Sequence, residues 1–147
     1  MKKEIIVGLL FALGSTGVAL SADDPIATRK AMMQNVGAAA KAGGQMLKGE
    51  IEFNAVAAEL LLRTMNTASL GIGELYPEGS EEGGKTTASP KIWEDRAGFD
   101  AAIAKFQTDT AAAIAAKPAD IEAFKAAFGS ATGNCGTCHK AFRVEKQ

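Results

Sequence analysis

Residues 120–143 read DIEAFKAAFGSATGNCGTCHKAFR, and this stretch near the C terminus decides the fold. Its apolar residues recur every three or four positions and so share one face of a helix, beginning with Ile121, Phe124 and Phe128. The pattern predicts one helix that begins around Ala119 or Asp120 and continues to Phe142. Three glycines in its second half lower the helix propensity there.

The pentapeptide Cys135-Gly136-Thr137-Cys138-His139 lies within this helix and has the spacing of a c-type haem attachment site. Positions i, i+3 and i+4 of a helix project from one side. Two thiols can therefore reach the two vinyl groups on one porphyrin edge while the imidazole reaches the iron. The pattern predicts one covalently attached haem c per chain, with Cys135 and Cys138 as attachment residues and His139 as proximal iron ligand.

Other uses of the two cysteines fit less well. A disulfide between them would close a very small loop and constrain the unfolded chain little. A zinc site needs about four ligands, whereas both cysteines and the only histidine of the chain lie in this pentapeptide. A thioredoxin-like redox pair requires a βαβ setting, and the sequence shows no strand pattern. A helical bundle that carries no haem is the remaining alternative interpretation.

The rest of the chain predicts three more helices. The first opens at Asp23, Asp24 and Pro25 and ends near Gly49. The second follows an N-cap at Asn54 and ends about Leu70. The third opens at Ser89 and Pro90 and ends at Lys117 and Pro118. Apolar residues mark their buried faces: Ile26, Met33, Ala40 and Leu47 in the first, Val56, Leu60, Leu61 and Met65 in the second, and Ile92, Trp93, Phe99, Ile103 and Phe106 in the third.

Two of the three connections are short, and the third, over residues 71–87, is long and glycine-rich. Four helices joined in this way predict an all-α, antiparallel four-helix bundle.

The N terminus predicts export. Residues 1–22 hold two lysines, a short apolar run and small residues before Ala22, which is typical of a cleaved signal peptide. We expect cleavage after Ala22, with Ser21 as the alternative, and one haem domain over residues 23–147 in the periplasm. The apolar run is too short for a stable membrane anchor. Loss of residues 1–22 changes the formal charge from −1 to −2, and nothing indicates nucleic-acid binding.

A haem motif on the last helix of such a bundle resembles the class II c-type cytochromes, the cytochrome c′ family. The resemblance extends over the mature chain through Arg29-x-x-x-Met33, Pro90-Lys91-Ile92-Trp93 and Cys135 to Phe142-Arg143. It implies that Met33 faces the distal side of the haem. In the low-spin branch of the family, typified by cytochrome c-556, a methionine there is the sixth iron ligand; in the high-spin cytochromes c′ the position is open.

The segments 33–37, 47–50 and 89–93 look more like the low-spin branch, which favours Met33 as the distal ligand. Met32 is the direct competitor, because periodicity alone does not exclude it; the family register chooses Met33. The resemblance also makes Arg29 and Arg143 candidates for pairing a haem propionate. For each of these two arginines, a solvated position on the protein surface is an equally good interpretation.

The function expected from these residues is electron transfer by a low-spin monohaem cytochrome that meets other redox proteins transiently. The alternative is a five-coordinate haem that binds nitric oxide or carbon monoxide. We expect no enzyme, because peroxide cleavage typically uses a distal histidine and the only histidine is His139. A homodimer through the first two helices, which many members of that family form, stays open.

Overall fold

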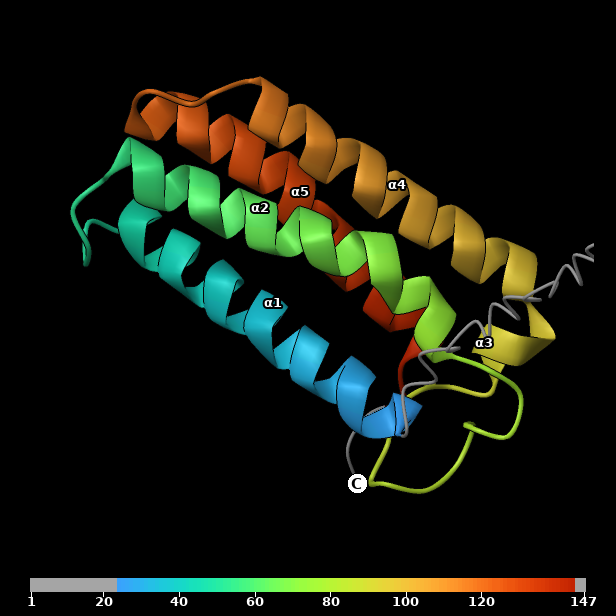
Figure 1. Ribbon diagram of the computed structural model, residues 1–147. Coiled ribbons are helices and arrows are strands. Elements are labelled where there is room, and N and C mark those ends of the chain that lie inside the picture. Colours follow the sequence, from blue (N-terminus) through green and yellow to red (C-terminus); the bar gives the residue numbers. More distant parts are fainter. Residues whose placement is uncertain (1–23, 145–147) are drawn as a thin grey trace, which may run out of the picture.

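The computed structural model describes residues 24–144, and the predicted signal peptide lies outside this range. Four long helices run side by side and alternate in direction along the chain (Figure 1). The predicted antiparallel four-helix bundle is confirmed. The helical elements are α1 (Pro25–Leu47), α2 (Ala55–Gly71), the 3-10 helix η1 (Ile72–Leu75), α3 (Lys91–Glu94), α4 (Arg96–Ala115) and α5 (Ile121–Phe142).

Three of the predicted helix starts are confirmed by capping hydrogen bonds. The side chains of Asp24, Asn54 and Asp120 each accept a hydrogen bond from the backbone N–H three residues later, at 2.8 to 2.9 Å. Such caps satisfy one of the backbone donors that a helix leaves free at its N terminus. Helix α5 then continues without a break through its glycines to Phe142, as predicted.

The third predicted helix is not continuous, which corrects the interpretation of residues 90–117. It consists of the short α3 and the long α4, separated at Asp95. The backbone of Asp95 leaves the helical region, and its side chain accepts a hydrogen bond from Gly98 N at 3.0 Å. Asp95 therefore caps a second helix. The N-cap of α3 is Pro90 and not the predicted Ser89, which lies one residue earlier and accepts a hydrogen bond from Lys91 N at 3.3 Å.

The main core lies between α1, α2, α4 and α5 and contains the fully buried Leu62, Met65 and Phe124. On α2 and α1, the residues predicted to be buried differ in part from those that the structure buries. Met65 is buried as predicted, but Val56 and Leu60 are 78% and 63% exposed, because α2 buries Ala58 and Leu62 in their place. The predicted face of α1 is only half-buried, and the buried residues of that helix are Arg29, Val36, Ala39, Gly43 and Met46.

Phe124→Ala is expected to lower the free energy of unfolding by about 3–5 kcal/mol, because it removes a fully buried ring from a close-packed core. The ring packs against Phe53 and Phe128, with centroids 6.0 and 5.1 Å apart. Urea unfolding of the holoprotein would measure the loss. Leu60→Ala, at an exposed position, should change the value by no more than about 0.5 kcal/mol. Equal losses in the two variants would contradict this assignment of the core.

The long irregular connection lies at one end of the bundle (Figure 1). We call residues 76–89 the strap. It follows η1, leads into α3, and passes the start of α1 and the end of α5, which meet it through hydrogen bonds. Within residues 24–144, no helix is long and apolar enough to cross a membrane.

Candidate functional site

The three residues of the predicted haem motif lie on the last two turns of α5. Cys135 and Cys138 are free thiols, and both are half-buried, whereas His139 is exposed. Burial raises the pKa of both cysteine thiols, so they are neutral at pH 7. Partial burial, and then the charge of Arg143, lower the pKa of the His139 imidazole. A neutral imidazole has the free lone pair that an iron ligand needs.

An apolar cluster lies beside Cys138. Its buried members are Ile92, Phe99 and Phe142, with Tyr76 and Trp93 packed against them. The rings are in edge-to-face contact: the centroids of Tyr76 and Phe99 are 4.9 Å apart, and those of Phe99 and Phe142 are 5.4 Å apart. The cluster covers the Cys138 side of the motif with rings from the strap, α3, α4 and α5.

The register of α1 against α5 is set where Gly43 meets Phe128. A Cβ at Gly43 would collide with the Phe128 ring, so only glycine lets the two helices come this close. The helices run in opposite directions. Met32 lies eleven residues before Gly43, and His139 lies eleven residues after Phe128. At 1.5 Å per residue, both lie about 16 Å from the contact. Met32 and Met33 are therefore level with His139 and Cys138.

The structure separates the two competing methionines by direction. The Met32 side chain leans toward α2, because its terminal methyl lies 3.8 Å from the position of a Cβ on Gly71. Successive residues of a helix differ by about 100° around its axis. Met33 therefore points to a different flank of α1 from Met32, although both side chains pack against the main core. It is half-buried, as is Ala40 two turns later on the same flank.

Arg29 and Arg143 have different surroundings. Arg29 is 3% exposed, so the surface reading of this residue is wrong. Its guanidinium donates hydrogen bonds to the Leu75 carbonyl, to both oxygens of Ser80 and to Thr86 Oγ1, at 2.7 to 3.0 Å. Arg143 is exposed and donates from Nε to Thr87 Oγ1 at 3.3 Å. The pairing of either with a propionate stays a prediction.

Sequence reasoning missed two features of the site. Asn134, one residue before Cys135, is buried and donates to Asp109 Oδ2 at 2.8 Å, which ties α5 to α4. Ser80 is 4% exposed and lies under the Arg29 guanidinium. The burial of Ser80 does not follow from periodicity, since it lies in an irregular segment, and the bond of Asn134 to Asp109 joins residues 25 positions apart.

These residues fit a covalently bound haem. Two neutral thiols and an imidazole project from the same side of one helix, beside aromatic side chains. Helix α1 packs mainly on α2, α5 packs mainly on α4, and the two pack much less on each other. Among residues 24–144, no group of three His, Cys, Asp or Glu side chains offers a competing metal site.

Comparisons with known proteins agree with this site. Residues 24–143 match the family model described as cytochrome C′. The chain is 42% identical to cytochrome c′ of Rhodopseudomonas palustris, over 96% of this chain and 94% of that protein. It is 33% identical to cytochrome c-556 of Agrobacterium fabrum, over 98% and 97%. The solved structure of cytochrome c′ from Rhodopseudomonas palustris superposes with a TM-score of 0.80 at 40% identity, covering 84% of this chain and 98% of that one.

Proposed function

Because this chain belongs to the cytochrome c′ family of class II c-type cytochromes and carries haem c, we propose that it is a low-spin electron carrier with His139 and Met33 as axial ligands. The observation that carries the proposal is the position of Met33. It lies level with the haem motif, on a different flank of α1 from Met32.

The chain's own residues divide the work. Cys135 and Cys138 would fix the haem to α5, and His139 would hold its iron through a ring nitrogen and Met33 through its thioether sulfur. The haem supplies the one-electron redox chemistry, with its potential raised by His and Met ligation and by burial. The aromatic cluster around Phe99 supplies an apolar wall beside Cys138. A site closed by its own ligands favours transfer of electrons over binding of small molecules.

The alternative is a high-spin haem that binds nitric oxide or carbon monoxide. The identity values favour it, since the match to a protein named cytochrome c′ is 42% and the match to a cytochrome c-556 is 33%. In that case Met33 would lie near the open position without bonding to the iron. The two functions differ in one bond, which a spectrum detects.

Partners and location follow from the same proposal. A carrier meets other redox proteins transiently, in the periplasm if residues 1–22 direct export. The family match begins at residue 24, just after the predicted cleavage site, which supports this location.

We propose no catalytic activity, because the single histidine is committed to the iron. The exposed Val56, Leu60 and Leu70 on α2 are where a second copy would pack in a homodimer.

The optical spectrum of the purified holoprotein tests the proposed function. A low-spin carrier should show sharp, separate α and β bands when reduced, a thioether-to-ferric charge-transfer band when oxidised, and no change on addition of carbon monoxide. The physical reason is that a bound Met33 occupies the only open coordination position. A broad, merged reduced band with a clear shift in carbon monoxide would replace the proposal by its alternative.

A further inference from the structure

We propose that Arg29 and the strap set the spacing between the helix that carries Met33 and the helix that carries His139, which makes Arg29 a positioning residue for the sixth ligand. This inference rests on the function proposed above, because it concerns the same two ligands. It depends on two attachments of the strap, one to α1 and one to α5.

The attachment to α1 is the buried guanidinium of Arg29, four residues and about one turn before Met33. Its Nη1 donates to Ser80 Oγ at 2.9 Å, and its Nη2 donates to the Ser80 carbonyl at 2.7 Å and to Thr86 Oγ1 at 2.9 Å. The cation also lies 4.6 Å from the centre of the Tyr76 ring. A buried charge is tolerated only while it is fully hydrogen-bonded, so Arg29 and the strap hold each other in place.

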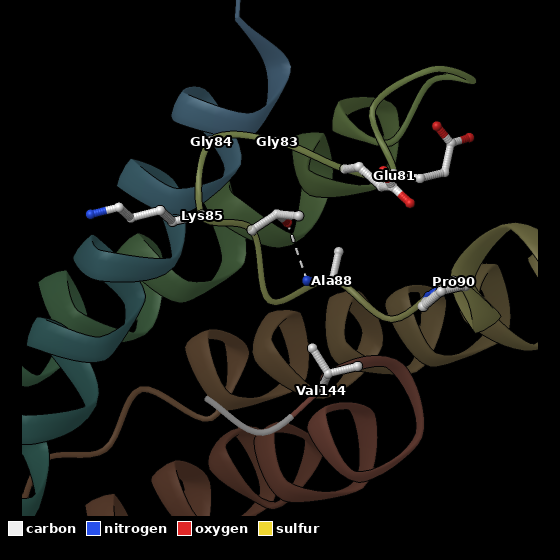
Figure 2. A pocket seen from close by; sticks show the side chains of 9 residues that line it. Glu81, Gly83, Gly84, Lys85, Ala88, Pro90 and Val144 are labelled. Atoms are coloured by element: carbon white, nitrogen blue, oxygen red, sulfur yellow. Dashed lines mark hydrogen bonds between the residues drawn. The ribbon is translucent and has the colours of Figure 1, made fainter. Parts of the chain in front are cut away.

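The attachment to α5 begins three residues after His139. Ser89 N donates to the Phe142 carbonyl at 3.0 Å, and Val144 N donates to the Thr87 carbonyl at 3.0 Å. These bonds form a short antiparallel bridge between Ala88 and Arg143. Figure 2 shows the strap running from Gly83, Gly84 and Lys85 beside α1 to Ala88 above Val144. One continuous segment thus holds the ends of both helices.

The strap matters because the two helices have little else to hold them together at this end. Helix α1 packs mainly on α2, whereas α5 packs mainly on α4, and the close contact of α1 with α5 at Gly43 lies far from the motif. A functional side chain must be held within about 0.5 Å of its working position. The strap joins α1, which carries Met33, to α5, which carries His139, close to both ligands. Its hydrogen bonds to the two helices therefore set how near Met33 lies to His139.

The test compares Arg29→Gln, Ser80→Ala and Thr86→Val with wild type, all as holoproteins. The last two variants weaken the attachment without altering the arginine. In Arg29→Gln we expect slow carbon monoxide binding to appear, where the wild type binds none, and the charge-transfer band to weaken, since the population with Met33 released increases. The other two variants should show smaller effects, and Arg29→Lys should restore part of the loss. Arg63→Gln, which removes an exposed ion pair with Glu59, is the matched control.

A second readout does not depend on the iron. Hydrogen exchange of the Ser89 and Val144 amides should quicken in Arg29→Gln, because release at α1 loosens the bridge at α5. Unchanged exchange and an unchanged carbon monoxide rate in all three variants would overturn the proposal. Faster exchange with unchanged iron properties would also overturn it, since the strap would then have only a structural role. If Arg29→Gln does not accumulate, the Ser80 and Thr86 variants decide.

The outcomes also distinguish this inference from the proposed function. A wild-type spectrum with an open iron would reject the Met33 ligand by itself. The strap would then be judged by whether it limits access to the iron: a faster carbon monoxide rate in Arg29→Gln than in wild type and Arg63→Gln would support it, and equal rates would end it.

Discussion

Met33→Ala should turn the holoprotein from a form that ignores carbon monoxide into one that binds it. The variant removes the thioether and leaves a methyl group that cannot ligate, so the sixth position opens. The charge-transfer band should disappear, and the reduction potential should fall by on the order of 100 mV, because axial ligands set haem potentials over a wide range. Spectra with and without carbon monoxide, together with a redox titration, measure both changes.

Met32→Ala is the matched control for this prediction. Met32 is also half-buried but leans toward Gly71 on α2, so its loss should leave the spectrum and the potential close to those of wild type. A charge-transfer band that survives in Met33→Ala and vanishes in Met32→Ala would show that the register of α1 had been assigned one residue too late.

The double variant Cys135→Ser, Cys138→Ser should carry no covalent haem at all. Serine hydroxyls do not form the thioether bonds that fix the porphyrin, so the denatured chain should have the mass of the polypeptide alone. Wild type should be heavier by one haem, and its haem absorption should stay with the chain through denaturation. Mass spectrometry of the unfolded proteins makes the comparison.

Thr137→Ala tests whether the loss is specific to the two thiols. Thr137 lies between the cysteines and is exposed, so its replacement should leave the haem mass in place. If the double variant does not accumulate, the wild-type mass still decides, because a polypeptide mass without haem would reject covalent attachment.

Much of the fold was predictable because local chemistry determines it. Asp24, Asn54 and Asp120 are capping residues directly before apolar periodic segments, and each begins a helix as predicted. The break at Asp95 was not predictable from pattern, because Ile92 and Phe99 are seven residues apart and would share a face in an unbroken helix. Only the capping bond to Gly98 divides the segment.

Contacts with segments distant in sequence determine which residues of α1 are buried, and the sequence pattern does not contain them. The seven-residue spacing of Ile26, Met33, Ala40 and Leu47 predicted the buried face of α1. The most buried residues of this helix, such as Val36 and Gly43, lie beside that face. The burial of Arg29 depends on carbonyl and hydroxyl groups more than forty residues away, at Leu75, Ser80 and Thr86. No periodicity within α1 contains that information.

Evolution can change the length of this chain in some places and not in others. One residue inserted between Met33 and Gly43 would turn the methionine by about 100° around the α1 axis and shift it by about 1.5 Å along that axis. The same residue inserted in the turns at 48–54 or 116–120 would be absorbed on the surface, leaving the helix faces as they are. Gaps between descendants of this gene should therefore collect in the turns, while the ten-residue spacing from Met33 to Gly43 is inherited unchanged.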